Sequence, residues 1–182
     1  TLEQCQGIQT CMVRFRLESN HFMRSCLIDM YARCGSILLA QEVFYKMQGH
    51  DIVTWNSMIS AYLQLGQNAL ALGLFYQLQQ EGLQPVDVTF LSILKSCIEN
   101  RTLKQGKLIH CYINERKPCV SIGNALIDMY TKCEDITYAF QVFSEITQPN
   151  VISWTSLVEG LIQNGFSEEG LIYFWKMQSE KV

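Results

Sequence analysis

Apolar side chains recur every three or four residues along most of the chain, and glycines or polar residues interrupt this spacing at regular distances. Between residues 52 and 86, one run of apolar positions shares a helix face and comprises Ile52, Trp55, Ile59 and Tyr62. Gly66 ends that run, and a second one follows until Gly82 and Pro85. No segment alternates apolar and polar residues for long enough to indicate a β-sheet. The pattern therefore predicts an all-α chain built from helical hairpins.

The hairpin pattern is repeated within the chain. Residues 25–44, SCLIDMYARCGSILLAQEVF, align with residues 124–143, NALIDMYTKCEDITYAFQVF, and half of the aligned positions are identical. The same offset pairs Trp55 with Trp154, and the first residues, TLEQCQGIQ, match TLKQGKLIH from Thr102. This repeat divides into three units of about 31 to 35 residues, each with two helices. Units of this kind bury their apolar faces against their neighbours, which predicts a helical solenoid.

The units resemble those of pentatricopeptide repeat proteins, and within that family the plant arrays in which long, short and standard units alternate. The short units carry LIDMY..C....A..VF, the standard units carry IVTWNSMISAY and VISWTSLVEGL, and the long unit carries DVTFLSIL.SC. The resemblance implies a right-handed superhelical solenoid of helix-turn-helix repeats. It divides the chain into the second half of a long unit (1–20), a short unit (21–51), a standard unit (52–86), a long unit (87–119), a short unit (120–150) and a truncated standard unit (151–182).

The resemblance also implies sequence-selective binding of single-stranded RNA, with about one base for each unit. In such arrays the fifth and the last residue of a unit form a base-reading pair. The pairs here are Ser25 with Asp51, Asn56 with Val86, Leu91 with Cys119, Asn124 with Asn150, and Thr155 with a partner beyond Val182. By the family's pairing rule, the first pair favours G and the Asn124 pair favours C over U. Asn56 favours a pyrimidine, Thr155 favours a purine, and Leu91 does not discriminate.

Two further sets of residues are expected near the RNA. The second residue of each unit is expected to lie beside the bases, and this set comprises Phe22, Val53, Val88 and Ile152, with Ser121 as a weaker member. Arg33 and Lys132 end the first helices of the two short units, where a cation could contact phosphate or simply interact with the helix dipole. Two residues depart from the family pattern. Val86 stands where the family usually has Asp or Asn, and Glu134 stands at the turn where the other short unit has Gly35.

Composition adds few constraints. Apolar residues make up 48% of the chain and charged residues 17%, which excludes a disordered chain, and no apolar stretch is long enough for a membrane span. The formal net charge of -3 does not by itself indicate a nucleic acid or a membrane as partner. The N-terminal residues show no targeting peptide. The chain is therefore interpreted as a fragment, and location in a mitochondrion or chloroplast is implied only by the resemblance.

No catalytic or metal-binding motif is found. The eight cysteines contain no CxxC pair, which favours free, buried thiols in a reducing compartment. Nucleotide-binding, hydrolase, zinc protease and deaminase motifs are missing as well. We therefore expect no enzymatic activity and no cofactor, although a catalytic tail such as a deaminase domain could lie outside this fragment. Trp55 and Trp154 are expected in the core, and Trp175 is expected at the surface or in an interface.

Two functions remain open at this point. The first is RNA recognition that guides organellar RNA editing or other RNA processing, in which an editing accessory protein could bind the apolar long unit around Leu91. The second is a protein-interaction scaffold without direct RNA reading, because helical solenoids often bind peptides. The first is favoured, since polar side chains occupy the fifth position in four of five units: Ser25, Asn56, Asn124 and Thr155. Neither a membrane nor DNA is an expected partner.

Overall fold

The computed structural model describes residues 1–17, 20–46, 49–114 and 119–180. Every regular element within these residues is an α-helix, as the periodicity predicts. The helices form two compact units, Thr1–Ser92 and Ile93–Val182, and the boundary between them falls inside one helix. In the described part of the chain, no helix is long and apolar enough to cross a membrane.

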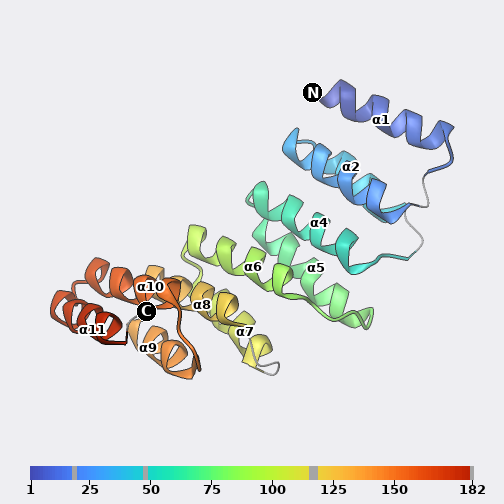
Figure 1. The fold of residues 1–182 in the computed structure, drawn as a ribbon. Helices are drawn as coiled ribbons and strands as arrows, with labels where there is room; N and C mark the ends of the chain where they lie inside the picture. Colours follow the sequence, from blue (N-terminus) through green and yellow to red (C-terminus); the bar gives the residue numbers. More distant parts are fainter. Residues whose placement is uncertain (18–19, 47–48, 115–118, 181–182) are drawn as a thin grey trace. The chain divides into compact units, whose positions relative to one another are not determined.

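The first compact unit is a stack of helical hairpins (Figure 1). It contains α1 (Leu2–Arg14), α2 (His21–Arg33), α3 (Ile37–Tyr45), α4 (Ile52–Gln64), α5 (Asn68–Gln80) and the start of α6 (Asp87–Asn100). The first helices of successive hairpins, α2 and α4, pack directly against each other, and each also packs against the second helix of its own hairpin. Leu27, Tyr31, Trp55 and Ile59 are buried between these helices.

The second compact unit repeats this arrangement. It contains the rest of α6, α7 (Leu103–Asn114), α8 (Val120–Lys132), α9 (Ile136–Glu145), α10 (Val151–Gln163) and α11 (Ser167–Ser179). The first helices α8 and α10 pack against each other, as α2 and α4 do, and α9 and α11 pack against them. The repeated sequence therefore gives two equivalent pairs of neighbouring first helices, one in each compact unit.

The tryptophans occupy the predicted environments. Trp55 and Trp154 are 2% and 3% exposed, and each makes an edge contact with a phenylalanine, at ring-centre distances of 5.0 Å to Phe44 and 4.8 Å to Phe143. Trp175 is 64% exposed. Equivalent aromatic pairs thus hold the first helix of each standard unit against the preceding hairpin.

The turns within the hairpins keep one backbone conformation even without glycine. Gly35 has a φ of 73°, in the left-handed region that glycine adopts readily, and Glu134 at the equivalent turn has a φ of 63°. Arg101 is a second non-glycine residue of this kind, with a φ of 50°. The side chains of these two residues pair at 3.2 Å, Arg101 Nη1 to Glu134 Oε1. An ion pair thus joins two turns whose backbones are costly for residues with a Cβ.

The expectation of buried thiols is wrong for most of the cysteines. All eight are free, but only Cys5 and Cys97 are buried, and five lie exposed: Cys11, Cys26, Cys34, Cys111 and Cys119. Cys34 and Cys119 lie at helix ends, and Cys11, Cys26 and Cys111 lie at exposed positions within helices. Burial, together with a contact of 3.7 Å to the Cys34 sulfur, raises the pKa of the Cys5 thiol. The described residues contain no cluster of His, Cys, Asp or Glu that could hold a metal ion.

Candidate functional site

The predicted base-reading residues lie near the N-terminal ends of the first helices. The fifth residue of a unit is one turn inside its first helix, and the last residue of that unit is the N-cap of the next first helix. Asp51 caps α4 by accepting a hydrogen bond from the backbone N–H of Thr54 at 2.8 Å, and Asn150 caps α10 in the same way from Ser153 at 3.0 Å. Because consecutive first helices pack side by side, the two members of a pair come together.

The first pair is linked through a third side chain. The Thr54 hydroxyl donates to Asp51 Oδ1 at 2.6 Å and lies 3.2 Å from the Ser25 hydroxyl. Ser25 also reaches the carbonyl of His21, one turn back in its own helix, at 3.0 Å. Ser25 is 5% exposed and Thr54 is fully buried, whereas Asp51 is half-buried. A ligand approaching this cluster therefore meets Asp51 first.

The Asp51 carboxyl is held in its charged form. Partial burial raises its pKa, but the hydrogen bonds from the Thr54 side chain and backbone, together with the charge of His21, outweigh that effect, and the pKa lies below its usual range. An ionised carboxylate can only accept hydrogen bonds. Among the described residues Asp51 Oδ2 has no bonding partner, so one charged acceptor remains available at this cluster.

The second pair is linked in the same way but with amides. Ser153 donates its hydroxyl proton to Asn124 Oδ1 at 2.6 Å, and Asn124 Nδ2 donates to Asn150 Oδ1 at 3.3 Å. The Ser153 hydroxyl in turn accepts from the backbone N–H of Asn150 at 3.1 Å. Asn124 is 8% exposed, Ser153 is fully buried and Asn150 is exposed. The structure thus brings both predicted pairs together, each around a buried hydroxyl.

The Asn56 and Val86 pair has the same hydroxyl but only one polar member. Thr89, which is 1% exposed, donates to Asn56 Oδ1 at 2.7 Å and accepts from the backbone N–H of Val86 at 3.2 Å. The Val86 side chain is 41% exposed and offers no hydrogen-bonding group. Leu91 and Cys119 belong to different compact units, and each is described only within its own unit. The Thr155 hydroxyl bonds to the carbonyls of Val151 and Ile152 in its own helix.

The hydroxyl residues of these clusters were not among the predicted site residues. Thr54, Thr89 and Ser153 are each the third residue of a unit, and a hydroxyl at this position recurs in three units of the sequence. In the other two units that position holds Met23 or Ile122. The recurrence is therefore a signal that the sequence contains, although a Thr or Ser near a helix start is usually a local capping residue.

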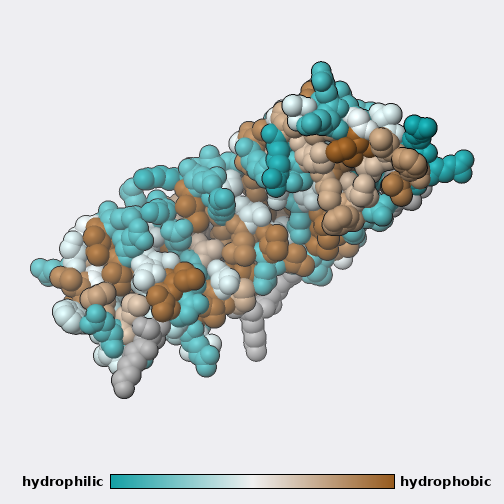
Figure 2. Space-filling model, turned by 45° about the horizontal axis from the view of Figure 1, so that its top comes forward, coloured by the Kyte–Doolittle hydropathy of each residue, from teal (hydrophilic) through white to brown (hydrophobic). Residues whose placement is uncertain are grey.

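Exposed apolar side chains accompany the polar clusters. Phe22, Val53, Val88 and Ile152, the predicted base-flanking residues, are 71%, 50%, 59% and 59% exposed. Ser121, at the equivalent position, is also exposed. Figure 2 shows apolar side chains at the surface among hydrophilic ones. None of these four side chains is needed for the core, so they are available to contact a ligand.

The predicted phosphate contacts are already engaged by the protein. Arg33, with a side chain that is 72% exposed, pairs with Asp29 one turn earlier at 2.9 Å. Lys132 donates to Gln163 Oε1 at 2.7 Å, across from α8 to α10. Lys132 lines a cavity of about 190 Å³ together with Asp128 and Glu159. Burial raises the pKa of Asp128, and the charge of Lys132 opposes that shift. Phosphate would compete with these protein partners at both cations.

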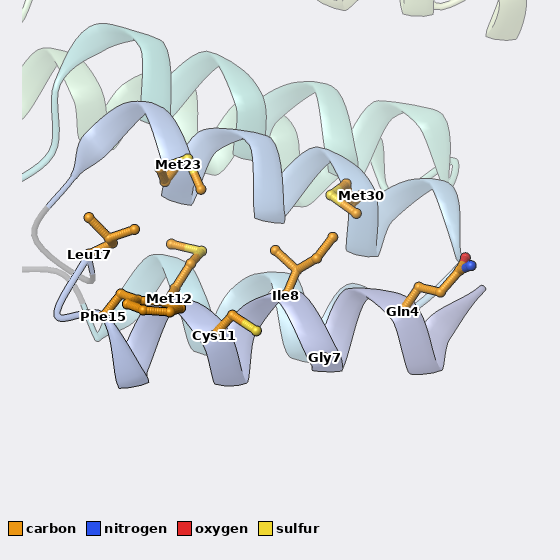
Figure 3. A pocket seen from close by; sticks show the side chains of 9 residues that line it. All are labelled: Gln4, Gly7, Ile8, Cys11, Met12, Phe15, Leu17, Met23 and Met30. Atoms are coloured by element: carbon orange, nitrogen blue, oxygen red, sulfur yellow. The ribbon is translucent and has the colours of Figure 1, made fainter.

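A separate apolar groove of about 530 Å³ lies between α1 and α2. Figure 3 shows side chains of the two helices facing each other across it, among them Ile8, Met12, Met23 and Met30. Its lining is completed by Gln4, Gly7, Cys11, Phe15 and Leu17. Its described lining residues include no charged side chain and no member of the polar clusters, so the groove is a feature distinct from them.

Models of a known repeat family match most of the chain. The PPR repeat family model matches residues 50–99, and the PPR repeat model matches residues 22–52, 124–150 and 152–182. The chain belongs to the pentatricopeptide repeat family. It is 38% identical over 167 residues to pentatricopeptide repeat-containing protein At5g16860 of Arabidopsis thaliana, and the aligned region covers 90% of this chain and 20% of that protein. It is 34% identical over 184 residues to At2g03880 of the same plant, a protein named mitochondrial. This aligned region covers 98% of this chain and 29% of that protein. The chain therefore spans less than a third of these relatives.

Solved structures of the family have the same fold. The crystal structure of the pentatricopeptide repeat protein PPR10 from maize matches with a TM-score of 0.73 at 17% identity, over 88% of this chain and 24% of that one. PPR10 in complex with an 18-nt psaJ RNA element matches with the same TM-score at 18% identity, over 91% of this chain and 26% of that one. These matches confirm the predicted class, a solenoid of helical pentatricopeptide repeats.

Proposed function

We propose that this chain is a segment of a sequence-selective single-stranded RNA-binding array in which each repeat contacts about one base. The observation that carries the proposal is the recurrence of one constellation at equivalent positions of three repeats: one or two polar side chains of a predicted pair around a buried hydroxyl, next to an exposed apolar side chain. A base has a polar Watson–Crick edge and an apolar face, and the constellation offers a partner for each.

The relatives support the proposal from a different direction. PPR10, which shares the fold, has been crystallised with an RNA element. Among the relatives of this chain, At2g03880 is named mitochondrial and At4g18520 chloroplastic. We accordingly propose an organellar location, and a role in guiding RNA editing or another processing step. In that role the repeats select the transcript, and catalysis is supplied by another domain or by a partner, which could bind the long unit around Leu91.

The charge of the chain makes the proposal more specific. A net charge of -3 gives little general attraction to phosphate, and the two candidate phosphate contacts already have protein partners. Affinity that arises mostly from counterion release would depend steeply on salt. We therefore propose that base contacts, rather than phosphate contacts, supply most of the discrimination by this segment.

Selection from a randomised RNA pool tests the proposal. The immobilised 182-residue chain is incubated with single-stranded RNA that is random at ten positions, and bound RNA is sequenced at increasing protein concentration. We expect enrichment of a short motif that contains, in the order of the repeats, G, a pyrimidine, an unspecified base, C and a purine. Enrichment of no motif, or of a motif that is unaffected by substitution of Asp51 and Asn150, would reject RNA reading by this segment.

A further inference from the structure

We propose that the buried hydroxyl of the third residue of a repeat is a specificity-determining positioning group for the repeat before it. The residues are Thr54, Thr89 and Ser153, and each would hold the side chains of the preceding base-reading pair in one hydrogen-bonding arrangement. The inference rests on the proposed function and adds a residue to it. It concerns positioning only, because these hydroxyls are buried and do not themselves face a ligand.

Two features common to the three hydroxyls carry the inference. Thr54 and Ser153 are fully buried, Thr89 is 1% exposed, and each belongs to the helix that follows the pair it contacts. Each also makes a fixed set of hydrogen bonds with both positions of the pair. A hydroxyl has one proton, so once its donor bond is assigned, the roles of all its neighbours are determined.

In the first cluster this reasoning leaves only acceptors free. The Asp51 carboxylate cannot donate, so the 2.6 Å contact commits the Thr54 proton to Asp51. Thr54 can then only accept from Ser25, whose own proton goes either to Thr54 or to the carbonyl of His21. In both cases Ser25 presents lone pairs, and Asp51 Oδ2 is an acceptor as well. Guanine, with adjacent N1–H and amino donors on its Watson–Crick edge, is the complementary base.

In the second cluster the same reasoning leaves donors free. The backbone N–H of Ser153 fixes Asn150 Oδ1 as the acceptor, so the Asn150 amino group points away, and it has no hydrogen-bonding partner among the described residues. Asn124 Nδ2 donates one proton to that same oxygen, which orients the Asn124 amide and leaves its second N–H free. The Ser153 hydroxyl lies 2.6 Å from Asn124 Oδ1 and 3.1 Å from Asn150 Oδ1, and we assign its one proton to the shorter contact, with Asn124. Cytosine, with its neighbouring N3 and O2 acceptors, is the complementary base.

In the third cluster the single polar member of the pair, Asn56, also presents hydrogen-bond donors. The backbone N–H of Val86 donates to the Thr89 oxygen, so the Thr89 proton goes to Asn56 Oδ1. Both amino protons of Asn56 therefore remain as donors, as a pyrimidine carbonyl requires. Without the hydroxyl, the Asn56 amide could turn by 180° and exchange its donor for its acceptor, and the Asn124 amide would be oriented only by its 3.3 Å bond to Asn150. Loss of the hydroxyl is therefore expected to relax base preference and not simply to weaken binding.

The experiment compares Ser153→Ala with Ser153→Thr in the randomised-pool assay and in direct binding to RNAs that differ only at the position recognised by Asn124. Ser153→Ala should lower the preference for C over the other bases by about fivefold, the effect of one net hydrogen bond of about 1 kcal/mol. Ser153→Thr keeps the hydroxyl and should restore the preference. Thr89→Val, which keeps the side-chain shape, should relax the pyrimidine preference at the position recognised by Asn56, two positions from the one recognised by Asn124, and leave the C preference intact.

The matched control is Ile122→Val, which alters a buried third residue that has no hydroxyl. It should leave every base preference unchanged, and urea denaturation of each variant measures its stability separately. If the wild-type chain enriches a motif but Ser153→Ala keeps its C preference, or loses affinity for all RNAs by one factor, the inference is wrong and the proposed function still stands. Failure of the wild-type chain to enrich any RNA would overturn the proposed function and the inference together.

Discussion

The polar cluster at Asp51 and the one at Asn150 occupy equivalent positions in the two compact units and differ in what they present to a ligand. Both are built from the fifth and last residues of a short repeat and a buried hydroxyl from the next helix. One leaves free acceptors, including a charged carboxylate oxygen, and the other leaves free amide protons. The scaffold is thus constant while two side chains change the chemistry, which is the property that a modular reader needs.

The comparison also shows how the scaffold and the site are connected. The last residue of each short repeat both caps the next helix and contributes to the polar pair. Asp and Asn are both good N-cap residues, so either can occupy this position without loss of the helix start. Variation in hydrogen-bonding character is therefore compatible with the fold at this position.

The largest expected effect comes from removing the scaffold beneath one cluster. Trp154→Ala, next to Ser153, should lower the free energy of unfolding by about 3 to 5 kcal/mol, because it leaves a cavity between packed helices. Trp175→Ala is the control, since its side chain is 64% exposed, and it should cost much less. Urea denaturation followed by circular dichroism measures both. Equal losses would mean that Trp154 does not hold the second cluster in place.

Reciprocal substitution of the capping residues should alter the two clusters in opposite directions. Asp51→Asn supplies amide protons where only acceptors were free, so the preference for G should decrease in favour of A, whose N1 is an acceptor. Asn150→Asp supplies acceptors, so the preference for C should decrease in favour of U, whose N3 carries a proton. Each change should be worth about 1 to 3 kcal/mol of discrimination, by analogy with base contacts in DNA.

Competition binding with RNAs varied at a single position measures both changes. Each substitution should affect one position of the motif and leave the others unaltered, and both variants should retain the helix cap. If both variants shift preference toward the same base, the difference in polarity between the clusters is not what selects the base.

The two compact units also differ at a buried tyrosine, and this difference affects stability in acid. Tyr31 donates to Gln9, while the equivalent Tyr130 lies 2.7 Å from His110 Nδ1. Burial lowers the pKa of His110, against the opposing effects of Glu145 and Asn114. The neutral ring is therefore favoured in the folded state, so its stabilising contribution is complete above the ordinary histidine pKa of about 6.5 and is lost as the pH falls through the lowered pKa.

Substitution at His110 should remove this acid sensitivity. His110→Gln reproduces the pair found in the first compact unit and should make the midpoint of urea denaturation depend less on pH between about 7 and 5. Gln9→His should introduce the same dependence in the first compact unit. An unchanged pH profile in His110→Gln would show that the acid sensitivity has another origin.

The smallest expected effect is that of the two cations. Lys132→Ala and Arg33→Ala should each weaken binding to all RNAs by one factor without altering base preference. If each residue contacts one phosphate, the slope of log affinity against log salt should decrease in magnitude by about 0.7, as expected for single-stranded nucleic acid. Binding measured at several salt concentrations tests this. An unaltered slope would mean that both cations act only in their contacts with Asp29 and Gln163.

The sequence predicted the fold well because the forces that determine it are periodic. Helical spacing and the internal repeat identify the hairpins, and the equivalent positions of Trp55 and Trp154 identify the core. The proposed base-reading pairs could be predicted only through the family resemblance, since residues 25 and 51 are far apart in the chain. The burial of Thr54 and Ser153 depends on a neighbouring helix, so their sequence positions alone show only a capping residue. The cysteines were misjudged because their apolar character does not reveal which helix face they occupy.

The most direct test of the account is to transplant the first cluster onto the second. The double variant Asn124→Ser with Asn150→Asp places the Ser25 and Asp51 pair around the Ser153 hydroxyl, while the surrounding scaffold is unchanged. In the randomised-pool assay, the account predicts that the position recognised by this repeat changes from C to G and that the rest of the motif stays the same. A position that still favours C, or a uniform loss of affinity without a new preference, would contradict it.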